Sequence, residues 1–321
     1  MHVYRWVFLL LLFTLTGCVP NGSADENATS VAPVSMTVSE EGSSFRLADE
    51  FGDYWYQGDA ELSSYTLSQA RYGELHAGEA VMIFVTEDFS KSRHVKLDYP
   101  VKSPADKVGV LKLNMTKTFN TGLYPYSMMT SSFTPIQRLA HPHTLKVATS
   151  SQEWCGHTFT QLNLRKNKYA LQFNSYFESE GDQSLTLDDV LLEDELWSLI
   201  RLDPDALPTG KLKMIPGTMY QRLSHNEWGV VNAEASLEPA DEEGLMHYTV
   251  KYEDYKRTLT IKFKKDFPYE IEGWEDTYQS GWGADAPMLT TRAVKKKRIM
   301  LDYWTRNRNQ DTPLRQELDL D

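Results

Sequence analysis

Apolar and polar residues alternate with a period of two along much of the chain after residue 53. The clearest runs have as their apolar members Leu111, Leu113 and Met115, then Tyr169, Leu171 and Phe173, and then Leu259, Ile261 and Phe263. Successive side chains of a strand point to opposite faces, so this alternation places one face on a core and the other in water. Such a pattern is typical of antiparallel sheets. Residues 80–85 are apolar throughout and predict a strand buried on both faces.

Short polar segments between such runs predict β-hairpins. One hairpin is expected from residues 157–164 and 168–177 around the turn 165–167, and another from residues 246–252 and 258–264. Residues 288–293 and 298–304 are two further strand candidates. The basic run 295–298 between them is expected to be a solvated turn or a protected edge, with a membrane-contact patch as the alternative.

A single segment has helical periodicity, and it predicts a helix over residues 187–202. Thr186 is the expected N-cap, and Asp203-Pro204 is expected to end the helix. Its apolar residues recur at helical spacing, and an acidic face is formed by Glu193, Asp194 and Glu195. The predicted fold is therefore mainly β, with one or more curved antiparallel sheets in a half-barrel-like arrangement and this one covering helix, which plugs or covers one side of a sheet.

The N-terminus has the layout of an export signal, with Arg5 before the apolar run 6–13. That run is shorter than the roughly 20 residues that a membrane-spanning helix needs. Leu15-Thr16-Gly17-Cys18 resembles the lipobox of bacterial lipoproteins. The resemblance implies that residues 1–17 are removed and that Cys18 carries the acyl chains. The alternative is an ordinary secretory signal with a chance cysteine. Val19, a non-acidic residue, favours the outer membrane under enterobacterial-type sorting.

The chain divides by composition into three parts. After the signal, residues 18–50 comprise the lipidated cysteine and a tether that is rich in Ser, Ala, Asn, Asp and Glu and is expected to be disordered. Residues 51–321 form the β-rich body. The proline-containing stretch 203–210 is a possible boundary between two units, and one continuous architecture is the alternative.

Charge and cysteine content exclude some functions. The formal net charge of −12 argues against nucleic acid as a partner and against lying flat on anionic lipid. Only two cysteines are present, so acylation of Cys18 leaves Cys155 without a disulfide partner in the chain. The sequence contains none of the common nucleophile-elbow, phosphate-loop, zinc-protease or dinucleotide motifs, and no cofactor is predicted.

The most suggestive chemistry lies at residues 150–157. If this stretch is extended, Glu153, Cys155 and His157 share one face, and they are the parts of a cysteine nucleophile with a base and an orienting carboxylate. Residues two apart on a strand are about 6.6 Å apart, however, whereas a nucleophile and its base need about 3 Å. The alternatives are a ligand-contacting pocket wall and plain core.

Two other groups are candidates for binding. His141-Pro142-His143, with Glu153 or His157, could form a metal site, although the proline favours an exposed loop, and no metal ligand is assigned. Aromatic and methionine side chains interleaved with glycine and proline can line a pocket. On this ground the candidate pocket residues are Trp55, Tyr124, Tyr126, Met128 and Trp154. A filled core and a glycan-stacking platform are the alternatives.

Several segments together resemble an uncharacterised lipoprotein family of Bacteroidota over most of the mature chain. They include residues 55–58, 78–81, 83–89, 124–130 and 150–157. Members of that family sometimes carry the label septum formation inhibitor Maf. True Maf proteins are cytosolic nucleotide pyrophosphatases with a Ser-x-Ser-Pro-Arg-Arg-type loop, which this sequence lacks. The resemblance therefore implies an envelope location and no specific activity. The predicted architecture is also similar to the half-barrels of periplasmic lipoprotein carriers.

These observations favour a membrane-anchored, non-enzymatic envelope lipoprotein that binds an amphipathic ligand or a partner protein. One alternative is a hydrolase or transferase that uses Cys155 and His157 on an envelope polymer. Another is a structural subunit of a surface complex, which would show a large exposed apolar patch instead of a pocket.

Overall fold

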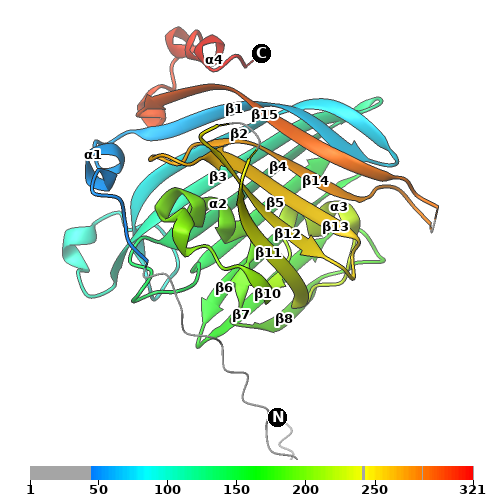
Figure 1. Cartoon of the computed structure of the whole chain (residues 1–321), viewed down its shortest axis with the longest axis horizontal. Helices are drawn as coiled ribbons and strands as arrows, with labels where there is room; N and C mark the ends of the chain where they lie inside the picture. Colours follow the sequence, from blue (N-terminus) through cyan, green and yellow to red (C-terminus); the bar gives the residue numbers. More distant parts are fainter. Residues whose placement is uncertain (1–44, 241–242, 284, 321) are drawn as a thin grey trace, which may run out of the picture. The chain divides into compact units, whose positions relative to one another are not determined.

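The computed structural model describes residues 45–240, 243–283 and 285–320, which belong to one compact unit. The signal segment, Cys18 and most of the expected tether lie outside the described residues. The described strands form a single, mainly antiparallel sheet (Figure 1). They are β1 (Ala60–Arg71), β2 (Glu74–Ser90), β3 (Lys107–Thr121), β4 (Tyr124–Pro135), β5 (Lys146–Glu153), β6 (Gly156–Arg165), β7 (Lys168–Ser175), β8 (Gln183–Asp188), β9 (Leu191–Leu192), β10 (Gly210–Ile215), β11 (Val231–Pro239), β12 (Leu245–Tyr252), β13 (Arg257–Lys264), β14 (Ile271–Gln279) and β15 (Met288–Leu301).

The helices in the described part of the chain are short. They are α1 (Phe51–Trp55), α2 (Glu193–Leu202), α3 (Thr218–Ser224) and α4 (Leu314–Glu317), with 3₁₀ turns at Pro100–Lys102, Pro204–Ala206, Tyr303–Thr305 and Asn309–Asp311. None of these described helices has the length and apolar content needed to cross a membrane.

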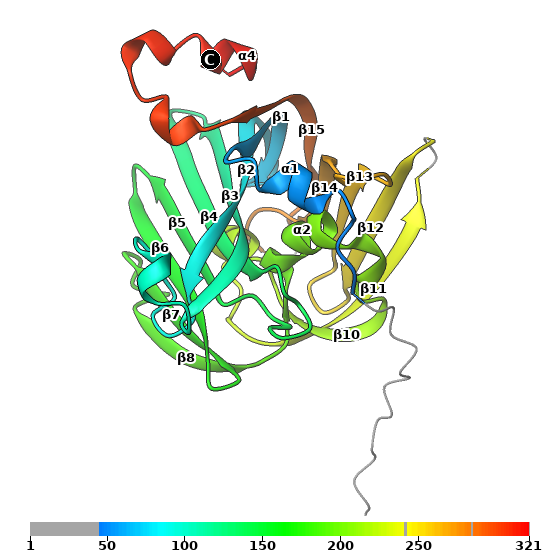
Figure 2. The ribbon, with the colours of Figure 1, turned by 90° about the vertical axis from the view of Figure 1, so that its left-hand side faces the viewer.

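The strand order explains the shape of the sheet. It runs β8-β7-β6-β5-β4-β3-β2-β1-β15-β14-β13-β12-β11-β10-β9, with β1 and β15 paired in the middle. Only residues 189 and 190 separate the two edge strands, β8 and β9, along the chain. A flat sheet of this width would hold its edges about 65 Å apart, at about 4.8 Å per strand, whereas this connection spans about 10 Å. The sheet must therefore bend back on itself, and Figure 2 shows its strands on both sides of α2.

The alternating patterns are confirmed as strands. In β7, Tyr169, Leu171 and Phe173 are buried while the residues between them are exposed. The apolar segment at 80–85 lies in β2, as predicted, but its two faces differ. Ala80, Met82 and Phe84 are buried on one face, whereas Val81 and Ile83 are half-buried on the other.

Both predicted hairpins are confirmed. β6 and β7 pair up to Arg165 and Lys168, and the two turn residues Lys166 and Asn167 have positive φ angles. Two successive positive φ angles are the geometry of a type I′ turn, whose twist suits a hairpin. β12 and β13 pair from Leu245–Lys264 to Tyr252–Arg257.

Of the two alternatives for the basic run at 295–298, the solvated turn is wrong, whereas the run does lie at an edge, because beyond Val294 the strand pairs with β1 alone. β15 is continuous through it. The Lys295 ammonium donates to the carboxylates of Glu270 and Glu272 at 2.6 and 2.5 Å, and Arg298 reaches Glu270 at 2.7 Å. The opposite charges come from Glu270 and Glu272, around the beginning of the neighbouring strand β14. The basic run therefore forms ion pairs with that part of the sheet and does not need a solvated turn.

The predicted helix exists and ends at Leu202 as predicted, but its start was wrong, and of the two expected positions it plugs the sheet. It begins at Glu193, because Thr186 and Asp188 belong to β8. All ten of its residues are buried, so α2 is enclosed by the bent sheet and does not cover it. Its apolar side chains join the main core, where the rings of Trp197 and Trp274 meet edge to face at 5.4 Å.

The acidic residues of α2 are interior groups with specific partners. Carboxylates suit the first turn of a helix, but burying them requires compensating charges or hydrogen bonds. Glu193 accepts two hydrogen bonds from Arg257 of β13, at 2.6 and 2.7 Å. Glu195 accepts the backbone N–H groups of Thr144 and Leu192 at 2.8 and 3.1 Å.

Asp194 differs from its two neighbours because no cation lies within ion-pairing distance of it among the described residues. Its carboxylate accepts the backbone N–H of Thr218, at the start of α3, at 2.9 Å. Burial raises the pKa of Asp194 to about 7. The native protein therefore holds a proton here at pH values where the unfolded chain has released it.

This proton makes a pH-dependent contribution to stability. Between about pH 4 and pH 7 the native state binds more protons at Asp194 than the unfolded state, so this residue lowers stability as the pH rises through that window. We expect Asp194→Asn to remove the decline, which is on the order of a few kcal/mol. Urea denaturation of both proteins at pH 4, 5, 6 and 7 measures it. Asp188→Asn, in an exposed pair, is the control. Parallel stability curves for wild type and Asp194→Asn would rule out the shift.

Candidate functional site

The stretch with the candidate cysteine contains a hairpin turn, so the condition of an extended backbone is not met at residues 154–155. Glu153 ends β5 and pairs with Gly156 at the start of β6, while Trp154 and Cys155 form the turn between them. His157 pairs instead with Gln152. No hydrogen bond joins Cys155 to His157 in the part of the chain that the structure describes.

The local electrostatics disfavour a reactive thiolate at Cys155. The thiol is exposed, and its backbone N–H donates to the Glu153 carboxylate at 2.6 Å. A hydrogen bond of the thiol itself with the Glu153 carboxylate, together with the negative charge of that carboxylate, raises the pKa of the Cys155 thiol above its usual value. The carboxylate that was expected to orient a catalytic base therefore acts directly on the thiol and keeps it protonated.

The five predicted pocket residues lie in different environments. Trp55 and Met128 are core side chains, and the Trp55 ring faces the guanidinium of Arg201 at 5.1 Å. Tyr124 and Tyr126 begin β4, with ring centroids 6.0 Å apart, and Trp154 is 67% exposed at its hairpin tip. The last three belong to one end of the sheet, where the structure places a cavity.

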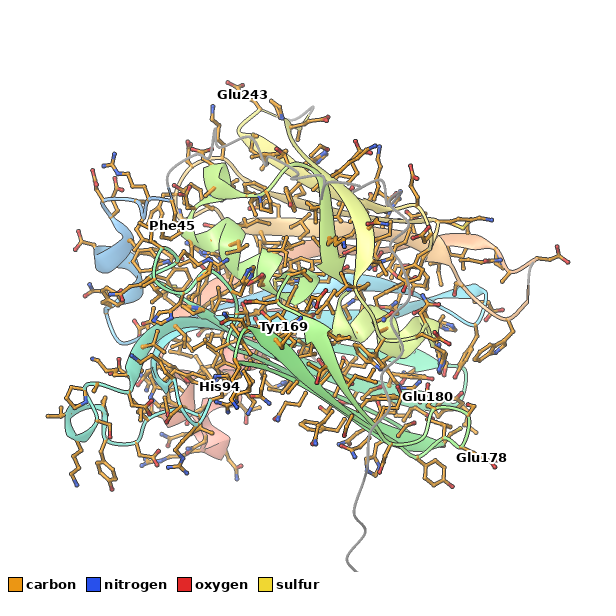
Figure 3. The ribbon with its side chains drawn as sticks, turned by 90° about the horizontal axis from the view of Figure 1, so that it is seen from below. Phe45, His94, Tyr169, Glu178, Glu180 and Glu243 are labelled. Carbon is orange, nitrogen blue, oxygen red and sulfur yellow. The ribbon has the colours of Figure 1, made fainter. Side chains whose placement is uncertain are left out.

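Several connections between neighbouring strands meet at this end, and five of them matter for the site. They are residues 72–73, 122–123, 154–155, 176–182 and 280–287. The chain after α3 reaches the same end, since His225 contacts Glu180. Figure 3 shows Glu178 and Glu180 together at this end of the sheet.

A cavity of about 350 Å³ lies among these connections, and we call it the Arg71 pocket. Its lining includes Arg71, Tyr72, Phe177, Glu180, His225 and Trp282, and also the predicted residues Glu153 and Cys155. A second cavity, of about 390 Å³, shares Glu180 and His225 with it. The Arg71 pocket is thus within the usual size of small-molecule sites, about 300–1,000 Å³.

His225 lies at the centre of the pocket's polar contacts. It caps α3 with a left-handed backbone (φ 58°), and its Nδ1 lies 2.6 Å from the Glu180 carboxylate. A carboxylate can only accept, so Nδ1 carries the hydrogen, and Nε2 accepts from the Arg71 guanidinium at 3.3 Å. Burial opposes ionisation of Glu180, but its hydrogen bonds with His225 and Ser175 hold the pKa of that carboxyl below its usual value.

Arg71 is a buried cation without a counter-ion. It is 5% exposed, and its guanidinium donates to the carbonyl of Leu223 and to the hydroxyls of Tyr72 and Tyr126, at 2.5, 3.2 and 3.3 Å. Its Nε has no hydrogen-bond partner. The other buried arginines of the described residues, Arg201, Arg222 and Arg257, each have a carboxylate within 4 Å, whereas Arg71 has none.

Two tyrosines share this charge with Arg71. The hydroxyls of Tyr72 and Tyr126 are 2.7 Å apart, and the Tyr72 ring lies 4.1 Å from the Arg71 guanidinium. Burial raises the pKa of Tyr72, but hydrogen bonds with Tyr124 and Tyr126 and the Arg71 charge outweigh it and lower that pKa. The predicted residues Tyr124 and Tyr126 therefore do not line the Arg71 pocket but contact side chains that do.

The pocket has a cationic group beside aromatic side chains, so it can bind an anion that also has an apolar part. A guanidinium that lacks a carboxylate favours a negatively charged ligand, and its planar fork suits carboxylate or phosphate oxygens. Tyr72, Phe177 and Trp282 supply aromatic surface, and Trp282 stacks near His225 with centroids 5.2 Å apart. The geometry thus fits an organic anion with an apolar body.

Sequence reasoning missed Arg71, Glu180, Arg222 and His225. Arg71 and His225 are 154 positions apart, so no local motif could join them. These four residues have no distinctive sequence context. Trp282, which also lines the pocket, does have one, because it stands between two glycines.

The histidine pair at 141 and 143 does not join the other predicted ligands. His143 lies 3.5 Å from Glu195 and 3.7 Å from Asp189, and the Glu195 carboxylate raises the pKa of the imidazole. Glu153 and His157 belong to the hairpin β5–β6. Within residues 45–320, apart from the three that are not described, no group of three His, Cys, Asp or Glu side chains could hold a metal ion.

Comparison of the chain with protein-family models, with curated proteins and with solved structures returned no match.

Proposed function

We propose that this chain is a cell-envelope lipoprotein, acylated at Cys18, whose body binds an amphipathic organic anion in the Arg71 pocket. The observation that carries the binding proposal is the buried Arg71 guanidinium, which faces a ligand-sized cavity without a carboxylate partner. The lipobox pattern at residues 15–18 supports the anchor, and Val19 supports the outer membrane as its location. The bent sheet acts in this proposal as a half-barrel that carries the binding site at one end.

The polar part of the ligand meets Arg71. A buried charge without an ion-pair partner destabilises the free protein. A bound anion therefore forms the ion pair and also removes this destabilisation. Hydrogen bonds to a charged group contribute about 1.5–3 kcal/mol each, which is roughly a 10- to 150-fold change in affinity. Arg222 adds a second buried guanidinium, although Glu180 lies 3.6 Å from it.

The apolar part of the ligand meets the aromatic rim. Exposed large side chains stand on the connections at this end of the sheet, among them Leu123, Trp154, Tyr176 and Trp282, which are 67–83% exposed. Rings at the mouth of a pocket give an apolar ligand a contact surface before its charged group is buried. This pairing of rim and cation favours an amphipathic anion over a simple inorganic one.

The binding test uses two probes of similar shape and opposite charge. We expect 4-phenylbutyrate to quench the tryptophan fluorescence of the purified chain, and 4-phenylbutylammonium to bind at least about tenfold more weakly. Arg71→Met should lose about tenfold or more of the affinity for the carboxylate, and Arg71→Lys should lose less because it keeps a charge. Arg292→Met, in an exposed pair with Glu275, is the matched control.

Equal affinity for the two probes, or full affinity in Arg71→Met, would contradict the binding proposal. The anchor has a separate test, since labelled palmitate should enter the wild-type chain and fail to enter Cys18→Ser.

A further inference from the structure

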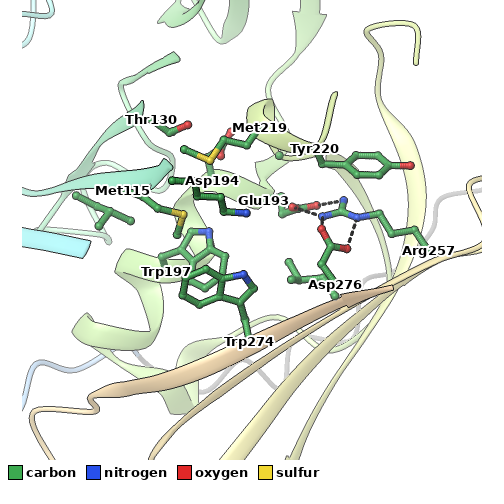
Figure 4. Close-up of a pocket in the computed structure, with 14 residues that line it drawn as sticks. Met115, Thr130, Glu193, Asp194, Trp197, Met219, Tyr220, Arg257, Trp274 and Asp276 are labelled. Carbon is green, nitrogen blue, oxygen red and sulfur yellow. Dashed lines mark hydrogen bonds and ion pairs between the residues drawn. The ribbon is translucent and has the colours of Figure 1, made fainter. Parts of the chain in front are cut away.

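A second, smaller cavity lies inside the bent sheet, and we call it the central cavity. Its volume is about 40 Å³, and Figure 4 shows the side chains that line it. Met115, Trp197 and Trp274 form apolar walls, while Lys117 and Asp194 are among its polar residues. It has room for about three non-hydrogen atoms, so only a very small molecule fits without movement of the walls.

Lys117 is the buried lysine of the described residues, at 8% exposure. Its ammonium makes no hydrogen bond and no ion pair to any described residue, and it lies 5.6 Å from the centroid of the Trp274 ring. The charged groups that face it from α2, β13 and β14 are Glu193, Asp194, Arg257 and Asp276. Two of the carboxylates are already occupied, because Arg257 bonds to both Glu193 and Asp276 at 2.6–3.0 Å.

An amine in this position is prepared to act as a nucleophile. Burial, opposed by the nearby carboxylates, lowers the pKa of Lys117 to about 8. At neutral pH a useful fraction of the side chain is then the free amine, which is the nucleophilic form. Asp194 shares the cavity, and burial raises the pKa of its carboxyl to about 7, so a proton donor stands in the same space.

We propose that Lys117 forms an imine with an aldehyde of one or two carbons, with Asp194 as the proton donor. The Lys117 nitrogen attacks the carbonyl carbon, and the nitrogen–carbon bond forms as the carbonyl π bond opens. One proton of the attacking nitrogen passes to the carbonyl oxygen, which becomes a hydroxyl. Asp194 protonates that hydroxyl, which leaves as water when the carbon–oxygen bond breaks. The nitrogen loses its proton to the Asp194 carboxylate, so the acid is restored and the net change is amine plus aldehyde to imine plus water.

The chain already contains the comparison that tests this reactivity. Lys168, which is 53% exposed beside Asp188, is an ordinary surface lysine of the same molecule. The full-length chain is treated at pH 7.5 with acetaldehyde and cyanoborohydride, which reduces an imine to a stable ethylamine, and peptide mass spectrometry measures each site. We expect Lys117 to be ethylated at least about tenfold faster than Lys168, because far more of its side chain is free amine.

Two controls separate reactivity from accessibility. In urea, Lys117 and Lys168 should react at similar rates, since the folded environment is lost. Asp194→Asn should slow ethylation of Lys117 by about tenfold or more while leaving Lys168 unchanged, as expected when a general acid is removed. If Lys117 in the folded wild type reacts no faster than Lys168, the proposal fails. That outcome leaves the Arg71 pocket untouched.

Discussion

Arg257→Met is expected to lower the free energy of unfolding by about 3–5 kcal/mol, because it leaves two carboxylates buried without their cation. The Arg257 guanidinium bonds to Glu193 through both Nη atoms and to Asp276 through Nε and Nη2. All three side chains are at least 88% buried. The Tyr220 ring lies 3.7 Å from the guanidinium and completes its surroundings. Chemical denaturation at pH 7 measures the loss.

A neutral replacement of the whole cluster provides the control. The triple variant Arg257→Met, Glu193→Gln, Asp276→Asn should recover much of the stability, since no uncompensated charge remains. Arg292→Met breaks an exposed pair and should change stability by less than about 1 kcal/mol. A loss in Arg257→Met no larger than in Arg292→Met would contradict the burial of this cluster.

Arg201→Met should be comparably damaging, by about 3–5 kcal/mol, because it severs α2 from β1. Arg201 and Glu61 are each 1% exposed, and the guanidinium Nη2 lies 2.7 Å from the Glu61 carboxylate. The Arg201 side chain also packs against the rings of Trp55 and Phe84, so methionine is chosen to retain part of that packing. Thermal and urea unfolding check the size of the effect.

A double-mutant cycle isolates the ion pair. Glu61→Gln and Arg201→Met should be less damaging together than the sum of the two single changes, by more than about 1 kcal/mol. The exposed pair of Lys168 and Asp188 is the matched comparison and should show a coupling below that value. Additive losses at Glu61 and Arg201 would mean that the two side chains do not interact in solution.

The strands were predictable from the sequence because strand burial has a local signature. Successive side chains of β7 point alternately to the core and to solvent, so apolar and polar residue types alternate along its sequence. The turn at Lys166-Asn167 was placed correctly for the same reason, since both flanking strands keep their alternation up to Arg165 and Lys168.

Burial of charged side chains has no such signature. The acids at the start of α2 are indistinguishable in sequence from a solvated helix face, and their buried partners are distant in the chain. Glu193 meets Arg257, which is 64 positions away. The solvated turn expected at residues 295–298 was wrong for the same reason. The acids that pair with Lys295, Glu270 and Glu272, are close to it in the fold but distant from it in the sequence.

The candidate site could be predicted only in part. Cys155 and Glu153 do line the Arg71 pocket, but the histidine that shares it is His225 and not His157. Arg71, Glu180 and His225 come together because several connections end at one side of the bent sheet, and the bend is set by the pairing order of all its strands. Strand order follows from long-range packing and not from local pattern.

The most direct test of the account follows the side-chain Nε–Hε signal of Arg71 by NMR during titration with 4-phenylbutyrate. The Arg71 Nε has no hydrogen-bond partner, whereas Arg257 is saturated by two carboxylates. We expect the ligand to shift the Arg71 signal in a saturable way and to leave the Arg257 signal in place. A bound ligand that leaves the Arg71 signal unmoved would contradict the assignment of this pocket.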